Sequence, residues 1–492
     1  MALASVAAAT LTGAMGQPVS VEVHVTSGVP CFTIVGLPDA AVRESRDRVR
    51  AALLSSGLEW PLRRVTVNLA PSGIKKGGAG LDLAIAIGLL IAHEGQLPPS
   101  AAHGLAFCGE LGLDGTLRHV PGMVALADAA VPGGLVVPLV DLREARLVRG
   151  DDAHGATKLE QLHRILRGHL PWPEPPAEQA DLTPPRVPEL ADVKGQAVGR
   201  HALEVAAAGN HHLLMIGPPG SGKTMLAQRL PGLLPPLSRE DSMEVTRIHS
   251  AAGVSLPREI LVTCPPFRAP HHQASIVSLV GGGSWSLRPG EISLASHGVL
   301  FLDEMGEFPV AALEALRQPL EEGVIRVSRA GGTVTFPAGF LLVAAMNPCP
   351  CGEGVYPGAC ACSSVARARY MRRLSAPLLD RFDLVVPLDR ADPEQLLADA
   401  AGESTAVVAE RVAAARRRAV DRKDSGEEVP MDSAGEDLLA AKLRAGELSA
   451  RGLHKVARVA RTIADLAGDQ QVGYAHVADA VSLRAARSAL VS

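Results

Sequence analysis

The fold is decided by residues 213–224, which read Leu213-Leu214-Met215-Ile216-Gly217-Pro218-Pro219-Gly220-Ser221-Gly222-Lys223-Thr224. Four apolar residues typical of a buried strand run directly into a glycine-rich loop. Leucines at helical spacing follow the loop, at positions 226, 230, 233 and 234. This order of strand, loop and helix is that of a P-loop, in which backbone N–H groups and the positive end of the helix hold phosphate oxygens. We therefore expect residues 217–224 to bind ATP, with Lys223 at the β- and γ-phosphates and Thr224 as a ligand of Mg²⁺.

Two further strand ends carry polar residues suited to phosphate chemistry. The apolar run 299–302 ends at Asp303 and Glu304. Asp303 would hold Mg²⁺ through water, and Glu304 would act as the general base on the attacking water. The structural alternative is an acidic strand end that only caps a helix. The run 341–345 leads to Asn347, which could position the same water or could be a simple turn residue before proline.

Arginines near the end of the chain could complete a phosphoryl-transfer site. Arg381 lies in a short stretch where it could reach the ATP of a neighbouring subunit, and Arg372 and Arg373 are substitutes for this role. The alternative for Arg381 is a surface ion pair with Asp380 or Asp383. Arg451 opens the main C-terminal helix and could sense the γ-phosphate, although an ordinary arginine at a helix start is a serious rival.

The 492 residues divide into three parts and a linker. Residues 1–167 mix strand and helix signals and predict an α+β domain. Residues 168–189 contain seven prolines and predict a linker. Residues 190–389 predict an α/β core with a parallel sheet, and residues 390–492 show only helical periodicity, which predicts a helical lid. Strands are expected over 19–25, 31–35, 64–69, 105–111, 213–216, 299–302 and 341–345, and helices over 39–56 and 81–92.

The amino-acid composition limits which kinds of partner the protein is expected to contact. The formal net charge is −4, so contact with DNA must come from local basic surfaces. Aromatic residues make up 3% of the chain, which argues against a single-strand binder built from stacking platforms. The apolar runs are shorter than the roughly 20 residues of a membrane span, so no membrane contact is expected. The seven cysteines are not arranged as a secreted disulfide framework, and we expect a cytoplasmic protein.

Four of the cysteines lie close together as an insert in the predicted core, within residues 349–362. Cys349, Cys351, Cys360 and Cys362 form two C-x-C pairs, with glycine and proline turning the chain between them. This pattern resembles a structural Cys₄ zinc knuckle, because four thiolates leave no open coordination position. Reduced thiols or a redox pair are the alternatives.

The order of P-loop, Asp303-Glu304, Asn347, Arg381 and Arg451 resembles an AAA+ ATPase. Longer motifs at 266–272, 288–295 and 298–304, with 36–39, 44–49 and 67–71 near the N-terminus, are similar to the magnesium-chelatase-like ATPases of the YifB/ComM family. The resemblance covers nearly the whole chain. It implies a ring, a homo-hexamer, that uses ATP to act as a helicase on single-stranded or branched DNA. In the competence members this helicase promotes branch migration during transformation, which would make recombination proteins further partners.

The N-terminal domain also resembles the proteolytic domain of Lon, of the ribosomal protein S5 domain 2-like fold, through Gly109-Glu110-Leu111, Pro121-Gly122 and the loop 75–80. Lon uses a serine that a lysine activates. Ala79 stands at the serine position here, and no lysine occurs from His119 to Ala130. We therefore expect a catalytically dead domain rather than a protease.

Cationic loops would be needed in the pore of a DNA-translocating ring. The candidates are the segment 268–288 and a hairpin over 325–336, in which Arg326 and Arg329 could neutralise phosphates. Solvated hairpin charges are the alternative. His271 and His272 are not expected to bind metal, because adjacent side chains diverge and no carboxylate is close in sequence. The run 416–418 of three arginines predicts a solvated helix face, with DNA contact as the alternative.

Three rival functions share parts of this pattern. A metal-insertion ATPase like magnesium chelatase would have the same core and would ignore DNA. A protein-remodelling ATPase would respond to unfolded polypeptide. A ring that serves only as a scaffold would leave Glu304 and Arg381 without a purpose.

Overall fold

A five-stranded parallel sheet forms the centre of the chain in the computed structural model, with strand order β11-β14-β17-β10-β18. The structure describes residues 2–93, 96–131, 133–174, 187–257, 260–283, 287–329, 332–353, 360–394, 402–425 and 430–485. The strands are β10 (Leu213–Ile216), β11 (Phe267–Arg268), β14 (Val299–Leu302), β17 (Leu341–Met346) and β18 (Leu384–Pro387). All neighbours pair in parallel, so every carboxyl end lies at the same edge. The parallel sheet expected for the core is therefore present.

The strands β10, β14 and β17 are buried along their whole length, which explains their uninterrupted apolar sequences. The helix after the P-loop differs from the expectation. Helix α7 (Lys223–Ala227) is one short segment, and a 3₁₀ turn over Leu230–Leu233 replaces its continuation. Pro231 explains the change, because proline has no N–H to donate to the preceding helical turn.

Short helices and hairpins connect the core strands. The helices are α6 (Ala197–Gly209), α8 (Arg239–Ala252), α9 (Ile276–Val280), α10 (Glu291–Leu294), α11 (Val310–Glu314), α12 (Arg317–Glu322), α13 (Ser364–Met371) and α14 (Ala376–Leu379). Strands β12 (Gly281–Gly282) and β13 (Arg288–Pro289) pair with each other, as do β15 (Val324–Arg329) and β16 (Gly332–Pro337). The second pair is the hairpin expected over 325–336; its turn at Ala330 and Gly331 lies outside the described residues.

The N-terminal part has a seven-stranded mixed sheet of order β3-β4-β2-β1-β5-β8-β9. Its strands are β1 (Ala2–Thr12), β2 (Met15–Thr26), β3 (Cys31–Val35), β4 (Arg64–Ala70), β5 (Leu105–Phe107), β8 (Gly134–Pro138) and β9 (Ala153–Ala156). Its helices are α1 (Ala40–Ser55), α2 (Asp82–Ala92), α3 (Met123–Ala129), α4 (Leu142–Arg149) and α5 (Leu159–Leu166). The single strand expected over 105–111 is wrong. It is interrupted after β5, because the N–H of Gly109 turns to the carbonyl of Gly80 and β6 (Glu110–Leu111) pairs with β7 (Leu117–Arg118).

The C-terminal part consists of α16 (Thr405–Ser425), α17 (Ser433–Arg444), α18 (Ala450–Ala467) and α19 (Tyr474–Ser482) among the described residues. The solvated face expected over 416–418 is wrong for Arg416, whereas Arg417 and Arg418 are exposed as expected. Arg416 is partly buried against α6 and donates to the carbonyl of Ala207 at 2.8 Å. Arg418 donates to the carbonyl of Asp465 on α18 at 2.6 Å.

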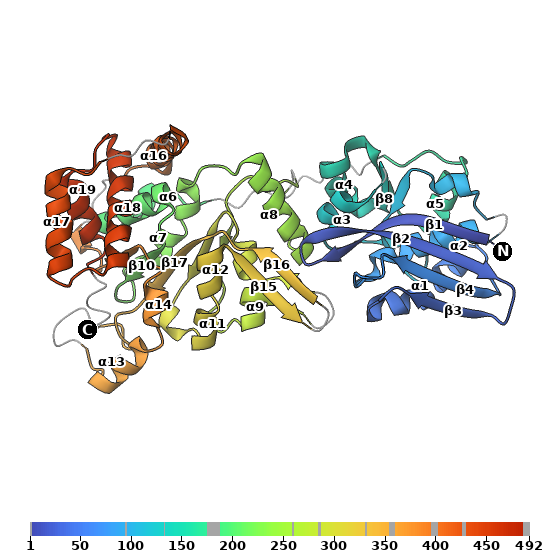
Figure 1. The fold of residues 1–492 in the computed structure, drawn as a ribbon, viewed down its shortest axis with the longest axis horizontal. Coiled ribbons are helices and arrows are strands. Elements are labelled where there is room, and N and C mark those ends of the chain that lie inside the picture. Colours follow the sequence, from blue (N-terminus) through green and yellow to red (C-terminus); the bar gives the residue numbers. More distant parts are fainter. Residues whose placement is uncertain are drawn as a thin grey trace.

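The three parts lie in a row, with the N-terminal part and the C-terminal helices on opposite sides of the core (Figure 1). Helix α3 packs against α8 of the core. Across this junction Ser250 donates to Glu144 at 2.6 Å, and Arg247 pairs with Asp128 at 3.1 Å. The predicted linker 168–189 lies mostly outside the described residues, at 175–186. No described helix has the length and apolar character needed to cross a bilayer.

Candidate nucleotide site

The P-loop leaves β10 and enters α7 at the carboxyl edge of the sheet. Gly220 and Gly222 adopt left-handed backbone angles, with φ of +80° and +81°, which glycine accommodates without strain. Lys223 turns back into the loop, where its ammonium donates to the carbonyls of Gly217 and Pro218 at 2.7 and 2.8 Å. Burial lowers the pKa of Lys223, and the nearby carboxylates of Asp303 and Glu304 oppose the shift. The loop thus has a cation at its centre and backbone groups around it.

A hydroxyl and a carboxylate meet beside this loop. The hydroxyl of Thr224 donates to Oδ2 of Asp303 at 2.7 Å. Thr224 lies in the first turn of α7 after β10, and Asp303 directly follows β14, so the sheet brings together two groups that are far apart in sequence. Hard oxygen ligands of this kind fit Mg²⁺, which keeps waters and takes one or two protein ligands. The residues expected to hold the metal are therefore adjacent.

Glu304 and Asn347 lie at the same edge. Glu304 has a left-handed backbone with φ of +51°, unusual for a residue with a side chain, and its N–H donates to Oδ1 of Asp303 at 3.0 Å. Oδ1 of Asn347, which follows β17, lies 3.4 Å from the ammonium of Lys223. The ring of Tyr370 on α13 lies against Gly306, where a Cβ atom would come within 2.4 Å of the tyrosine hydroxyl.

His272 is a site residue that the sequence analysis missed. The expectation that the side chains of His271 and His272 diverge is wrong, because their ring centroids lie 4.1 Å apart. Nδ1 of His272 lies 3.2 Å from Oε2 of Glu304, a carboxylate that is distant in sequence. The reason is topological: β11 pairs in parallel with β14, so the chain segments leaving these strands emerge side by side. A polar residue shortly after a strand that neighbours the acidic one is the signal that could have identified His272.

The arginines divide between several partners in the same chain. Arg381 forms an ion pair with Glu321 of α12. Burial lowers the pKa of Arg381, and the charges of Arg451 and Arg317 add to the shift. Arg451 is exposed at the start of α18.

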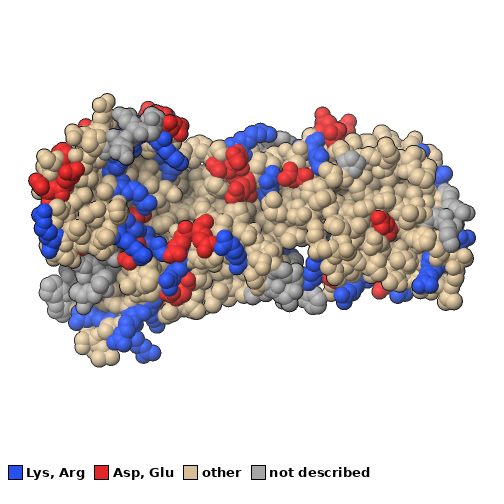
Figure 2. Space-filling model, viewed as in Figure 1, with Lys and Arg blue, Asp and Glu red and all other residues tan. Residues whose placement is uncertain are grey.

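The two substitutes for Arg381 differ in their surroundings. Arg373 donates to the carbonyl of Gly306 at 2.7 Å and to Glu307 at 2.9 Å, which ties it to its own chain. Arg372 is exposed, together with Arg367 and Arg369 of α13. Figure 2 shows basic side chains gathered at the lower left of the molecule, where Figure 1 has α13.

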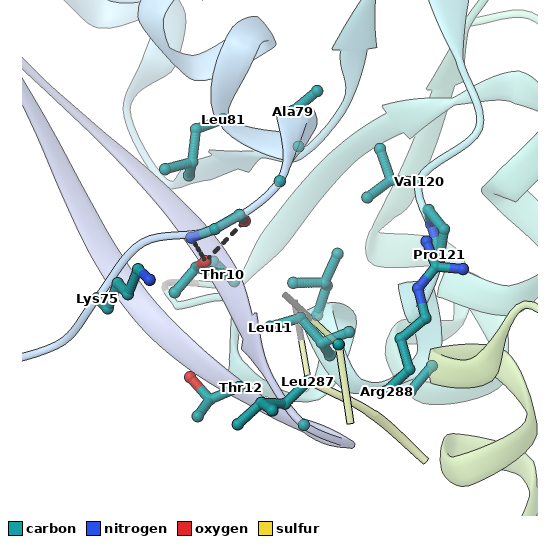
Figure 3. A pocket seen from close by; sticks show the side chains of 18 of the residues that line it. Thr10, Leu11, Thr12, Lys75, Ala79, Leu81, Val120, Pro121, Leu287 and Arg288 are labelled. Carbon is teal, nitrogen blue, oxygen red and sulfur yellow. Dashed lines mark hydrogen bonds between the residues drawn. The ribbon is translucent and has the colours of Figure 1, made fainter. Parts of the chain in front are cut away.

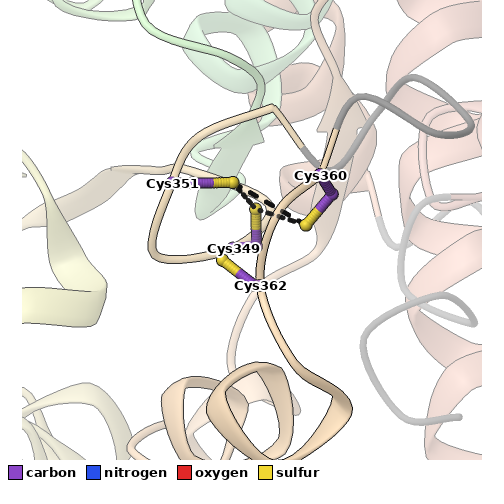
Figure 4. A group of neighbouring side chains, drawn as sticks. All are labelled: Cys349, Cys351, Cys360 and Cys362. Carbon is purple, nitrogen blue, oxygen red and sulfur yellow. Dashed lines mark hydrogen bonds between the residues drawn. The ribbon is translucent and has the colours of Figure 1, made fainter.

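The four clustered cysteines converge as a metal site requires. Their Sγ atoms all lie within 4.8 Å of one another, and Figure 4 shows them turned toward a common centre. The separations are 3.3 Å between Cys349 and Cys351, 3.7 Å between Cys351 and Cys360, and 3.6 Å between Cys360 and Cys349. Zinc at the usual Zn–S length places tetrahedral sulfurs about 3.8 Å apart. A hydrogen bond from the backbone of Glu353, aided by the neighbouring cysteines, lowers the pKa of Cys351 to about 6, and the same contact with Cys351 raises the pKa of Cys362.

The hairpin arginines give a mixed picture. Arg326 is half-exposed and forms an ion pair with Glu322. The side chain of Arg329 lies outside the described part of the chain, so its proposed contact with DNA stays a prediction. Strand β16 of the hairpin packs on the N-terminal part, because a Cβ at Gly13 would come within 2.3 Å of Val334.

A cavity of about 610 Å³ lies between the N-terminal part and the core, at the position of the predicted dead protease site. Ala79 and the glycines beside it form part of its wall, with Lys75 and Arg288 on opposite sides (Figure 3). The hydroxyl of Thr10 is engaged with the backbone of Gly77. No serine, cysteine or histidine is among the described residues that line this cavity. Among its described lining residues there is therefore no Ser–Lys pair.

Comparison with known proteins adds three matches to family models. Residues 189–396 match magnesium chelatase, subunit ChlI; residues 21–140 match subunit ChlI of Mg-chelatase; and residues 402–484 match the ChlI C-terminal model.

The chain is similar over its full length to several bacterial proteins. It is 46% identical to an uncharacterized protein of Mycobacterium tuberculosis, over 98% of this chain and 99% of that protein. It is 42% identical to the uncharacterized protein YifB of Escherichia coli (99% and 97%) and 42% identical to the competence protein ComM of Haemophilus influenzae (99% and 98%). A shorter stretch, 38% of the chain, is 27% identical to a probable DNA helicase, MCM9, of Arabidopsis thaliana, of which it covers 24%.

Proposed function

Since the chain belongs to the magnesium-chelatase-like family that includes YifB and ComM, we propose that it is an AAA+ ATPase that works as a ring motor on DNA. The observation that carries the ATPase is the meeting of Lys223, Thr224, Asp303, Glu304 and Asn347 at one edge of the parallel sheet. These side chains come from three different strand ends, and phosphoryl transfer needs each of their chemistries.

Each residue has one role in this proposal. Thr224, and Asp303 through water, would hold Mg²⁺, which would supply charge neutralisation at the phosphates. The ammonium of Lys223 leaves the carbonyls of Gly217 and Pro218 for the β- and γ-phosphate oxygens, and residues 217–222 surround the phosphates. Glu304 accepts a proton from water as the water oxygen bonds to the γ-phosphorus and the bond to the β–γ bridging oxygen breaks. Asn347 orients that water, and the products are ADP and inorganic phosphate.

The motor is proposed to be a homo-hexamer, with ATP between the P-loop of one subunit and Arg381 of the next. Arg381 is our first choice for this trans contact because it follows the short helix α14, from which we expect it to reach the ATP of the neighbouring subunit. Arg373 is tied to its own chain through Gly306 and Glu307, and the exposed Arg372 stays a substitute. Release of Arg381 from Glu321 would accompany assembly. Arg451, whose charge contributes to the lowered pKa of Arg381, would then sense the γ-phosphate.

The DNA substrate is proposed from local charge and from relatives. Competence protein ComM and the partial match to a probable DNA helicase favour DNA over a metal-insertion or protein-remodelling substrate. Arg326 of the hairpin and the exposed arginines of α13 supply basic side chains despite the net charge of −4. Contacts of this kind are independent of sequence and weaken with salt. We propose branch migration of single-stranded or branched DNA, with recombination proteins as partners.

The four cysteines are proposed to hold one structural zinc ion per chain, because their spacing fits a tetrahedral site. Metal analysis after gentle purification should find about one equivalent of zinc. A protein without zinc would contradict this part of the proposal.

One experiment tests the function. ATP hydrolysis is measured with no DNA, with single-stranded DNA and with branched DNA, together with strand displacement on a labelled three-strand junction; Glu304→Gln serves as the blank. Stimulation by DNA and ATP-dependent displacement are expected. If the rate of ATP hydrolysis is the same with and without DNA and no strand is displaced, the proposed motor on DNA is refuted. A metal-insertion or protein-remodelling ATPase is then favoured.

A further inference from the structure

The loop that carries the four clustered cysteines, described over residues 349–353 and 360–362, lies directly on the P-loop. We call it the four-cysteine loop. Gly352, between Cys351 and Glu353, has a left-handed backbone with φ of +83°. A Cβ atom at this position would come within 2.5 Å of Cδ and 2.8 Å of Cγ of Pro219. These distances leave no room for a side chain, so the backbone of the loop and the ring of Pro219 are in van der Waals contact.

The same loop continues from the residue that faces the P-loop lysine. Cys349 is buried and comes two residues after Asn347, whose side-chain oxygen is 3.4 Å from the ammonium of Lys223. The N–H of Gly352 donates to the carbonyl of Cys349 at 3.0 Å, which closes the turn between the two contacts. The loop therefore connects both sides of the nucleotide site through only a few residues.

A third contact braces the outer side of the loop. Glu353 pairs with Arg390 at 2.6 Å, and Arg390 follows β18 closely. The N–H of Leu388, directly after β18, donates at 2.7 Å to the carbonyl of Ile216, the last residue of β10 before the P-loop. The described part of this loop contains no helix or strand, so its shape depends on these contacts and on whatever holds the four thiols together.

We infer that the four-cysteine loop is a positioning element of the nucleotide site, which holds Pro219 and Asn347 in place only when its four thiols share a metal ion. The inference rests on the proposed binding of ATP and zinc. It means that metal and nucleotide bind cooperatively, because each stabilises the loop conformation that the other requires. Coupling between two sites is reciprocal and commonly amounts to about 5-fold to 150-fold in affinity.

A pair of matched glycine variants separates the contact from the metal. Gly352→Ala adds a methyl group against Pro219, whereas Gly253→Ala adds one at a similar backbone angle, φ of +74°, with nothing within 4 Å. Zinc content and the Kd of a fluorescent, non-hydrolysable ATP analogue with Mg²⁺ are measured for both. We expect both variants to keep one zinc, Gly253→Ala to bind the analogue like the wild type, and Gly352→Ala to bind it at least about 5-fold more weakly. Unchanged binding by Gly352→Ala would overturn the inference.

The unmodified protein gives a second test that does not depend on how Gly352→Ala folds. Cobalt(II) placed in the cysteine site reports its geometry through its visible absorption bands. Saturating ATP analogue should shift these bands, and chelation of the metal should weaken analogue binding by the factor by which the analogue tightens the metal.

The outcomes separate the inference from the function on which it rests. If chelation leaves the Kd of the analogue unchanged and the analogue leaves the cobalt absorption bands unchanged, the positioning role is overturned, whereas the proposed ATPase is not. A wild-type chain that binds no analogue would overturn the proposed function and this inference together.

Discussion

Asp383→Asn should loosen the junction between the ATPase core and the C-terminal helices. The side chain of Asp383 has no exposed surface, and its carboxylate lies 2.8 Å from the ammonium of Lys455 and 2.8 Å from the guanidinium of Arg458, both on α18. It also accepts the N–H of His212, next to β10. Burial opposes ionisation, yet the nearby His211, whose Nδ1 lies 3.8 Å from Oδ2 of Asp383, and the charges of Lys455 and Arg458 hold the pKa of this carboxyl well below its usual range.

The size of the effect follows from which charge is left without a partner. Asparagine keeps the shape and an acceptor for His212 but removes the negative charge. Arg458 is 60% exposed and can be hydrated, whereas Lys455 is only 21% exposed. Removing one partner of a buried pair costs about 3–5 kcal/mol, and the exposure of Arg458 favours the lower end, about 3 kcal/mol. At roughly 2–4 °C per kcal/mol for a unit of this size, the Tm should fall by about 6–12 °C.

Calorimetric melting of the full chain measures this loss, with Asp437→Asn on the exposed face of α17 as the matched control. A carboxyl whose pKa is lowered in the fold contributes stability above its unfolded pKa and loses it as the pH falls toward the folded pKa. The gap between wild type and Asp383→Asn should therefore persist from about pH 8 to pH 5 and shrink only below about pH 4. An Asp383→Asn protein with the same Tm as the Asp437→Asn control would refute the reasoning.

Four further outcomes are expected. Lys223→Ala should abolish binding of an ATP analogue in calorimetry, because the ammonium at the centre of the P-loop is lost. Glu304→Gln should keep that binding while turnover falls by about 10²–10⁴-fold, and weakened nucleotide affinity would contradict its role as the base. His272→Ala should lower kcat about tenfold with KM unchanged, since it removes the group 3.2 Å from Glu304, while His271→Ala as control should not. Burial lowers the pKa of His212 to about 4, so this side chain stays neutral in the folded protein near pH 5. Because the unfolded chain binds a proton there, the folded state loses up to about 1.4 kcal/mol of stability per pH unit as the pH falls below about 6.5. Urea unfolding near pH 7 and pH 5 should show this loss, and replacing His212 with Gln should reduce it.

Local patterns were enough for much of the fold. The strand over Leu213–Ile216, the strand before Asp303 and the helix Asp82–Ala92 were predicted closely, because burial and periodicity leave a signal within a few neighbouring residues. The parallel sheet and the family followed from the same short motifs. Convergence of Thr224 and Asp303 could also be anticipated, since carboxyl ends of parallel strands share one edge.

Tertiary structure decided which segments that are distant in sequence come into contact. Ala2–Thr12 has few residues that favour strands, and it becomes β1 because β2 pairs along its whole length. Cysteine spacing suggested a metal site but gave no sign that Gly352 rests on Pro219, which only the packing of two loops determines. His272 meets Glu304, and Arg381 meets Glu321, through the order of strands and helices around the sheet. The sequence by itself determined the elements and the chemistry available at their ends, whereas tertiary structure decided which of those ends touch, because propensity acts over a few residues and contacts between elements depend on how the whole chain packs.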